Sequence, residues 1–288
     1  MADRDVAIVT PSYGPDRERC RLLCDSIDAR VRNLAHHYIL VADHDVASFR
    51  AFAGSRRSVV AESDVLPERF ACVRLGRPLW LSTFAPPLRG WHLQQLRRIA
   101  LAAHVDHAAL LYCDSDMAFS REFDTRALWR GERVRLYRNP KGIGEQLAGG
   151  GLEHMSWTTH AHRLLGLAPP RFPAHDYINN LVSWRREGVL AMLARIERVT
   201  ERPWLRAIAS RRAFSECQIY GAFADEVEQG DRTWRDETRL CLTRWGGSSM
   251  KRDELLAYMA TMDERQVAIG IQSFTQTDPA VLRDVLGL

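Results

Sequence analysis

The sequence lacks the features of a membrane-spanning protein and of a secreted, disulfide-rich one. No stretch approaches the roughly 18 consecutive apolar residues of a spanning helix. The first ten residues, MADRDVAIVT, have no apolar core of the kind found in signal peptides. The six cysteines form no CxxC pair and show no regular spacing, and most lie in apolar segments. We therefore expect a soluble, cytoplasmic protein with reduced thiols, or one that contacts the inner face of a membrane peripherally.

Lysine is also scarce, and the net charge is small. Lys141 and Lys251 are the only lysines among 40 cationic residues, and the formal net charge is +4. This balance fits an anionic substrate or a membrane surface but is too weakly basic to indicate nucleic acid as a partner. The dominance of arginine is typical of some genome compositions. It still has a chemical consequence, because the planar guanidinium binds phosphate through a fork that lysine lacks.

The first half of the chain alternates between strand-like and helix-like segments. Apolar runs predict strands within residues 5–10, 36–45, 57–64 and 107–116. Helical spacing of apolar residues predicts helices at 17–31, 46–52 and 91–104. Alternation of this kind is typical of an α/β fold with a mixed, mostly parallel sheet and helices on both faces.

The second half has a different pattern. The segment RNPKGIGEQLAGGG, residues 138–151, is glycine-rich and predicts a flexible loop. Helices are expected at about 176–198 and 214–227, and a last strand at 267–274. We interpret residues 1–288 as a single domain. Its nucleotide-binding half covers about residues 1–125, and a mixed half, about 126–288, closes over it.

Polar residues follow three of the predicted strands where each strand ends. They are Thr10, Ser12 and Asp16 after the first, Asp43 and Asp45 after the second, and Asp114 and Asp116 after the fourth. In open parallel sheets, ligands bind in the crevice at the carboxyl ends of the strands. The sequence therefore predicts a binding site at this edge of the sheet.

Asp114 and Asp116 raise a question of charge balance. Residues two apart in an extended backbone point to the same side, so the two carboxylates would share a small region and repel each other. A divalent cation, Mn²⁺ or Mg²⁺, is the natural partner, because such ions prefer oxygen ligands and are often held by one or two carboxylates together with substrate phosphates. The alternative is a solvated strand end without a metal.

Four segments in order carry a resemblance to a known family. IVTPSYGPD, GWHLQQLRRIA, CDSD and FSECQIYG resemble the motifs of bacterial glycosyltransferase-like proteins of the GT-A fold, over about residues 5–225. The resemblance implies a GT-A-like, Rossmann-type sheet and a nucleotide-sugar donor, for which we favour a UDP-sugar. It also implies a divalent cation on the DxD pair and a carbohydrate, lipid-linked or small-molecule hydroxyl acceptor bound by the second half. Polysaccharide or glycolipid biosynthesis is the process this suggests.

The resemblance also assigns residues to the donor site. Those expected to bind the donor are Thr10, Pro11, Ser12, Asp43, Gln94, Gln95, Arg98 and Asp114, and those expected to bind the metal are Asp114 and Asp116. The first three would lie against the nucleotide, Asp43 would face its base, and the residues of the predicted helix at 91–104 would line the donor. For the two glutamines a solvated helix face is the alternative.

Glu216 is the candidate catalytic residue. Ser215 is a good N-cap and Gln218 would complete a capping box, which places Glu216 in the first helical turn, where the helix dipole favours an anion. The resemblance matches Glu216 to the acid that deprotonates the acceptor in inverting enzymes, although an acid here is also good helix design without any chemistry. One departure from the family stands out: no histidine follows His175, and Thr243 stands where a further metal ligand is expected. Another oxygen or water would then complete the metal's ligands.

Two further segments suggest a role. HDYINNLVSWRREG, residues 175–188, would face the acceptor through Asp176, Tyr177, Asn179 and Trp184, with a capped structural helix as the alternative. His154, His160 and His162 lack the i, i+4 spacing of a helical zinc site, so we interpret them as ordinary helix residues.

Two other functions remain open: a nucleotide- or sugar-binding relative without catalysis, and a haloacid-dehalogenase-like phosphatase, whose nucleophilic DxD motif normally follows the first strand.

Overall fold

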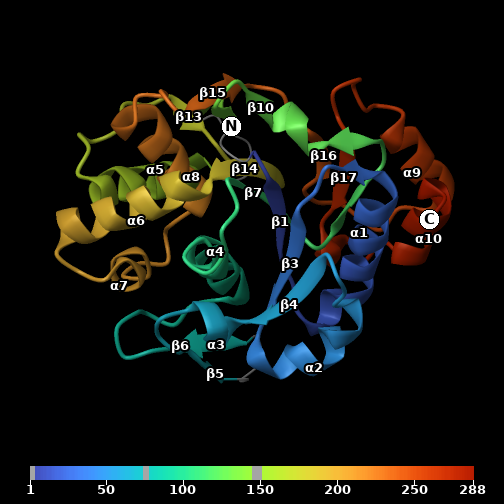
Figure 1. Cartoon of the computed structure of the whole chain (residues 1–288), viewed down its shortest axis with the longest axis horizontal. Helices are drawn as coiled ribbons and strands as arrows, with labels where there is room; N and C mark the ends of the chain where they lie inside the picture. The colour runs from blue at the N-terminus through green and yellow to red at the C-terminus, as the bar shows by residue number, and fades with distance from the viewer. Residues whose placement is uncertain (1–3, 74–77, 145–150) are drawn as a thin grey trace.

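A mostly parallel five-stranded sheet forms the centre of the molecule (Figure 1). The computed structural model describes residues 4–73, 78–144 and 151–288. The strand order is β14-β7-β1-β3-β4, with β1 (Val6–Pro11), β3 (His36–Val41), β4 (Arg57–Ala61), β7 (Ala109–Cys113) and β14 (Leu181–Arg185). Within this sheet, β1, β3, β4 and β7 are parallel to one another, and β14 pairs antiparallel with β7. The predicted α/β fold class is confirmed.

Helices cover both faces of this sheet because its strands are apolar on both sides. On β1, Val6 and Ile8 pack with Leu23 of α1 (Arg17–Arg30), whereas Val9 packs in the other core with Leu96 of α4 (Gly90–Leu101). Successive strand residues point to opposite faces, so one short apolar run supplies both cores. Burial of each apolar side chain of this size contributes about 1.5–3 kcal/mol to the free energy of folding.

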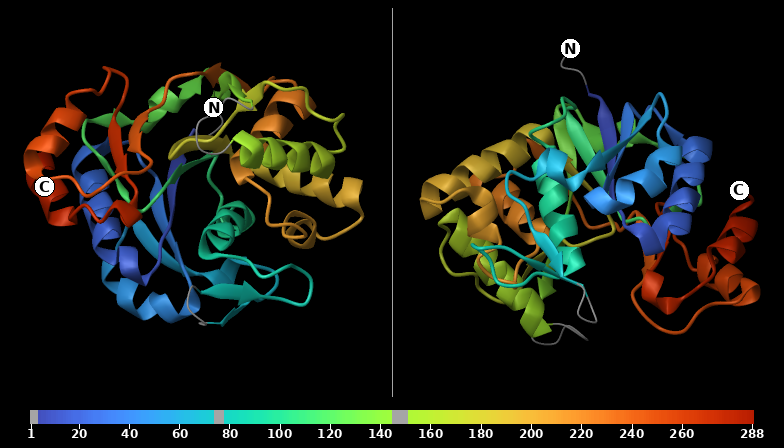
Figure 2. Two further views of the ribbon diagram at one scale, coloured as in Figure 1. Left: turned by 180° about the vertical axis from the view of Figure 1, so that it is seen from behind. Right: turned by 90° about the horizontal axis from the view of Figure 1, so that it is seen from below.

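Four helices of the second half lie on the α4 side of the sheet (Figures 1 and 2). They are α5 (Gly151–Leu165), α6 (Arg186–Thr200), α7 (Trp204–Ile208) and α8 (Glu216–Ala222), which continues as a π-helical turn over Phe223–Val227. The glycine-rich segment is only partly a loop: residues 139–143 form β12 (Asn139–Ile143), and Gly151 begins α5. Residues 145–150, with Gly149 and Gly150, lie outside the described residues.

The prediction of a helix at 176–198 was wrong for its first ten residues. They form the end of β13 (Ala174–Asp176), a connecting segment and β14, and α6 begins only at Arg186. Every residue from Leu181 to Trp184 is buried, and Ser183 Oγ donates a hydrogen bond to the Arg135 carbonyl (2.7 Å). Pairing with the edge of β7 therefore outweighed the helical propensity of the segment.

A second, three-stranded sheet continues the chain beyond β7. It contains β8 (Met117–Phe119), β17 (Ala268–Ile271) and β16 (Cys241–Arg244), and β8 pairs antiparallel with β17. The last strand expected from the sequence is thus confirmed. α9 (Arg252–Met259) and α10 (Pro279–Leu286) pack beside it, near α1. The connection between β7 and β8, which carries the acid pair, is held between the two sheets.

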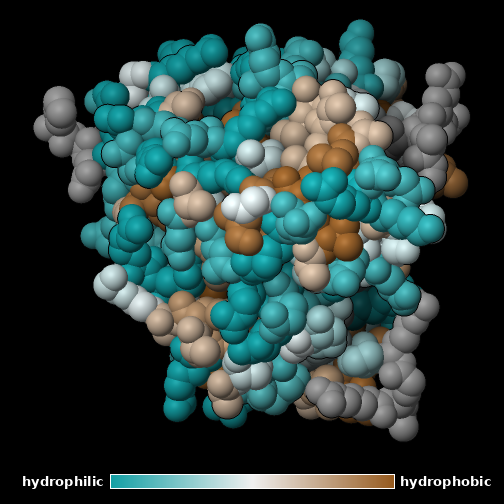
Figure 3. All heavy atoms as spheres, turned by 90° about the vertical axis from the view of Figure 1, so that its right-hand side faces the viewer, coloured by the Kyte–Doolittle hydropathy of each residue, from teal (hydrophilic) through white to brown (hydrophobic). Residues whose placement is uncertain are grey.

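Short elements complete the described structure. They are β2 (Val31–Arg32), β5 (Ala71–Val73), β6 (Leu79–Leu81), β9 (Phe123–Asp124), β10 (Trp129–Arg130), β11 (Arg133–Tyr137), β15 (Thr233–Asp236), α2 (Val46–Phe49) and α3 (Glu62–Val65). The surface over α1, α9 and α10 is mostly hydrophilic, with a few hydrophobic patches (Figure 3). In the described ranges, every helix is too short or too polar to cross a membrane.

Candidate active site

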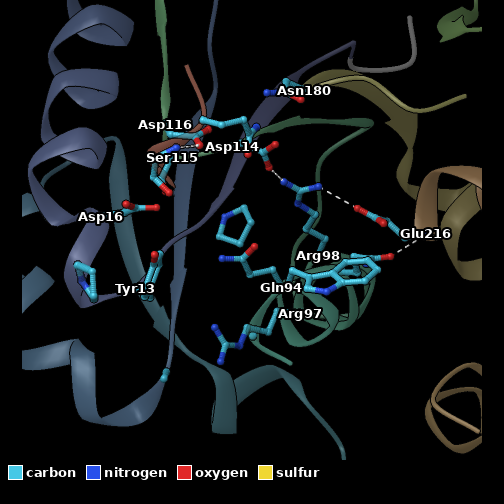
Figure 4. Close-up of a pocket in the computed structure, with 18 of the residues that line it drawn as sticks. Tyr13, Asp16, Gln94, Arg97, Arg98, Asp114, Ser115, Asp116, Asn180 and Glu216 are labelled. Carbon is cyan, nitrogen blue, oxygen red and sulfur yellow. Dashed lines mark hydrogen bonds and ion pairs between the residues drawn. The ribbon is translucent and has the colours of Figure 1, made fainter. Parts of the chain in front are cut away.

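A cavity of about 830 Å³ lies at the carboxyl ends of β1 and β7 (Figure 4). This is the edge where ligands bind in open parallel sheets. Seven of the residues assigned to the donor, the metal or catalysis line it: Pro11, Gln94, Gln95, Arg98, Asp114, Asp116 and Glu216. They come from the end of β1, from α4, from the β7–β8 connection and from the start of α8. The fold therefore brings together side chains that are up to about 200 positions apart in the chain.

The two acids of the DxD motif both line the cavity, but they have different partners. Asp114 lies directly after β7 and accepts a hydrogen bond from Arg98 Nη2. Asp116 lies directly before β8, and its Oδ2 accepts a hydrogen bond from the Ser273 backbone N–H (3.0 Å). The other oxygen of Asp116, Oδ1, is buried and has no hydrogen-bond partner among the described residues.

The two acids differ in their electrostatic surroundings. Asp114 forms an ion pair with Arg98, so its charge is neutralised within the protein. Burial, with the nearby Asp16 carboxylate as the second cause, raises the pKa of Asp116 to about 6. Burial also raises the pKa of Asp16, which lines the cavity at the end of the β1–α1 connection. The acid that crowds Asp116 is thus Asp16.

Arg98 connects the acid pair to the candidate base. It lies on α4, its side chain is 10% exposed, and its Nη1 donates to Glu216 Oε1 (2.8 Å) while Nη2 donates to Asp114. Figure 4 shows the guanidinium between the two carboxylates. A buried arginine that bridges two acids offsets charge on both of them and fixes their separation.

The start of α8 holds Glu216 in place. Ser215 Oγ accepts a hydrogen bond from the Gln218 backbone N–H (3.4 Å), as expected for an N-cap, and Gln95 Oε1 accepts from the Glu216 N–H (3.0 Å). Gln218 does not close the predicted capping box, because its side-chain amide donates to Asp176 Oδ1 (3.0 Å). Glu216 is only 4% exposed, so its carboxylate depends on Arg98 for compensation.

Three residues assigned to the donor lie outside the cavity lining. Thr10 and Ser12 are fully buried, and Thr10 Oγ1 bonds His37 Nε2 (2.9 Å) on the other side of the sheet. Strand alternation explains this, since Pro11 between them is the residue that faces the cavity. Asp43 is exposed and accepts from the Ser63 N–H (3.4 Å), whereas Asp45 lines the cavity and accepts from the Gly14 N–H (3.0 Å).

The acceptor segment expected at 175–188 divides between core and cavity. Tyr177 and Trp184 are buried in the hydrophobic core, whereas Asn179 lines the cavity, as does its neighbour Asn180. Both asparagines are more than nine-tenths buried, and the Nδ2 of each has no hydrogen-bond partner in the described ranges. Asn180 was missed because nothing in its local sequence distinguishes it from the residues around it.

The histidines of α5 are structural. His160 and His162 are buried, and their rings bond the carbonyls of Ile208 (3.5 Å) and Ala168 (2.8 Å). In the part of the chain that the structure describes, no group of three or more His, Cys, Asp or Glu residues is arranged to hold a metal ion.

Comparisons with known proteins place this geometry in context. A family model matches residues 6–286 and is described as a family of unknown function, DUF6492. The chain belongs to this family. No curated protein matches the chain.

Among solved structures, the chain is similar to an active-site mutant of LgtC, a GT-A-type glycosyltransferase, with a TM-score of 0.50 and 13% identity. The match covers 92% of this chain and 86% of the LgtC chain. At this identity the likeness establishes the fold alone. This DUF6492 chain therefore has a glycosyltransferase-like, GT-A-like Rossmann-type fold.

Proposed function

We propose that this chain transfers a sugar from a nucleotide-diphosphate donor, for which we favour a UDP-sugar, to a hydroxyl acceptor with inversion at the anomeric carbon. The observation that carries the proposal is the Asp114–Arg98–Glu216 bridge on the wall of a large cavity. It joins an acid that we propose as a cation ligand to the carboxylate that we propose as the base, the two groups that such a transfer requires. The glycosyltransferase-like fold supports the same assignment.

Asp114 and Asp116 would hold a divalent cation, Mn²⁺ or Mg²⁺. Two properties of Asp116 support this role: its Oδ1 is buried and has no hydrogen-bond partner among the described residues, and burial beside Asp16 raises its pKa to about 6. The described residues offer no third His, Cys, Asp or Glu ligand, so diphosphate oxygens and water would complete the coordination, as is common for Mg²⁺. When bound, the cation would neutralise charge on the departing diphosphate.

Glu216 would take the proton of the acceptor hydroxyl. Its pairing with Arg98 orients the carboxylate, and the Gln95 and Ser215 contacts fix the backbone from which it projects. A carboxylate that is positioned in this way within reach of the hydroxyl typically contributes 10²–10⁴-fold in rate. The second guanidinium contact, to Asp114, fixes the base relative to the acid pair before any substrate binds.

Turnover of matched variants tests these roles. We expect Asp116→Ala and Glu216→Gln each to remove transfer activity, with Glu216→Gln leaving donor binding nearly unchanged. Glu68→Gln is the matched control, because Glu68 pairs with Arg206 on α7 and neither residue lines the cavity. Full activity in both site variants would overturn the role assignments.

A further inference from the structure

Four tryptophans line the cavity, and the proposed chemistry uses none of them; one of the four, Trp245, follows β16 (Cys241–Arg244). Trp80, Trp91 and Trp157 all line the cavity; they belong to β6, α4 and α5. The rings of Trp91 and Trp157 are in contact, with centroids 5.8 Å apart and planes inclined at 54°. We call these three side chains the aromatic wall.

Each ring of the aromatic wall is supported from behind. Trp91 packs on the His92 ring at 4.0 Å between centroids, and Trp157 stacks on His154 at 4.6 Å. Trp80 lies against Gly90, where an added Cβ would come within 3.4 Å of the indole. Because the rings of Trp91 and Trp157 pack on neighbouring histidines, only the rest of each ring is left to line the cavity. The wall is therefore pre-formed, and a ligand would not have to order it.

The aromatic wall also carries hydrogen-bond donors without partners. The indole Nε1 atoms of Trp80 and Trp157 are buried and unbonded among the described residues, as is the Nδ2 of Asn179. Leaving a buried donor unpaired is unfavourable, so a ligand oxygen that accepted a hydrogen bond from these groups would be stabilised. Apolar ring faces next to unpaired donors match a ligand that combines C–H surface with hydroxyl oxygens.

Trp91 is connected to the Glu216 side of the cavity through His92. His92, which supports Trp91, bonds the Arg212 carbonyl through Nε2 (3.0 Å), and its ring packs on Phe214 at 5.3 Å, two residues before Glu216. Tyr13 and Asp16, at the end of β1, lie on the opposite side from Glu216 (Figure 4). A group bound on Trp91 would therefore be on the side of the base and across the cavity from the carboxyl end of β1.

We propose that the aromatic wall is the acceptor subsite and binds a pyranose ring, so that the acceptor is a carbohydrate. This deepens the proposed function and rests on it. The C–H face of the pyranose would lie on the exposed surface of Trp91 and Trp157. Its hydroxyl oxygens would accept hydrogen bonds from the indole N–H groups and from Asn179. A nucleobase also stacks on indole, so the test separates the two.

Binding of simple sugars, measured without any donor, tests the proposal. Methyl glycosides of glucose, galactose, mannose and N-acetylglucosamine would be titrated against the protein by saturation-transfer NMR and tryptophan fluorescence. At least one should bind, and Trp157→Ala and Trp91→Ala should each weaken it about tenfold. Trp157→Phe, which keeps a ring but loses the N–H, should retain part of the affinity. Trp204→Phe on α7, outside the cavity lining, is the matched control and should bind as the wild type does.

Three results would overturn the subsite. They are the absence of binding by all four glycosides, unchanged sugar binding in folded Trp157→Ala, and loss of UMP binding, in place of sugar binding, in the tryptophan variants. The last would make the wall a nucleobase site. Failure of the proposed function has a different signature, because full transfer activity in Asp116→Ala and Glu216→Gln would leave these sugar-binding results untouched.

Discussion

Removing the Arg98 guanidinium should destabilise the protein strongly. In Arg98→Met the volume is roughly kept, but Glu216, whose side chain is 5% exposed, loses its charge partner. Breaking a buried pair by removing one member costs about 3–5 kcal/mol. Asp114 is 31% exposed and can be solvated, so we expect the lower end of that range, about 3 kcal/mol. In a chain of this size that corresponds to a fall in melting temperature of roughly 6–12 °C.

Differential scanning fluorimetry at neutral pH measures this effect, with Arg126→Met as the matched control. Arg126 pairs with Asp124 on the surface, where both partners remain hydrated, so its loss should leave the melting temperature nearly unchanged. Adding Glu216→Gln to Arg98→Met should recover much of the loss, because the uncompensated charge is then removed. Equal melting temperatures for the Arg98 and Arg126 variants, or no recovery in the double variant, would refute the bridge.

Three further predictions concern stability. Gly221→Ala should cost about 3 kcal/mol or more, because its Cβ would lie 2.0 Å from the Tyr177 ring, while Gly54→Ala, with open space around it, should melt normally; a normal melt for Gly221→Ala would contradict the packing. Burial lowers the pKa of His160 to about 4, so between pH 6.5 and 4 the unfolded chain binds a proton at this histidine and the folded chain does not. The free energy of unfolding, measured by denaturant titration, should therefore fall by about 3 kcal/mol over this pH range. The fall should be smaller in His160→Asn. The raised pKa of Asp116, about 6, has the opposite sign: in chelator, Asp116→Asn should be about 3 kcal/mol more stable than wild type at pH 7, and the gap should close as pH falls towards 4. A gap independent of pH would argue against a buried Asp116.

Much of the fold was predictable because local patterns of apolar residues determine its strands and helices. The apolar runs of β1, β3 and β7 are short and bounded by polar turns, and the spacing of Leu23 and Ile27 marks the buried side of α1. β14 was missed because its four apolar or neutral residues run directly into α6, and only its pairing with β7 makes it a strand. Such pairing is a tertiary effect that no local pattern reports.

The candidate site was predictable as a location but not as a set of contacts. Strand ends in a parallel sheet meet at one edge, so the positions of Asp114 and Asp116 followed from the strand pattern. That Arg98 pairs with Asp114, and that Asp16 lies close to Asp116, depends on how α4 and the β1–α1 connection pack. Which of Thr10, Pro11 and Ser12 faces the cavity depends on the phase of β1, which the motif alone does not give.

The glycine of the FSECQIYG segment shows what the motif encodes physically. Gly221 lets the Tyr177 ring pack directly on the α8 backbone, and Tyr177 in turn donates to Asp225 (2.7 Å) in the π-helical turn. The motif therefore specifies the packing of α8 as well as the acid at its start. The same helix start holds Glu216 towards Arg98.

The binding of a nucleotide-diphosphate sugar by the cavity is the central claim, and a thermal-shift screen tests it most directly. UDP-, GDP-, CMP- and dTDP-linked sugars would each be added with and without Mn²⁺ to the wild type and to Asp116→Ala. A ligand that binds only the folded state raises the melting temperature by mass action. We predict stabilisation by a diphosphate donor, with UDP-linked sugars favoured, that requires Mn²⁺ and is lost in Asp116→Ala. No stabilisation by any donor, or the same stabilisation in Asp116→Ala, would contradict the account.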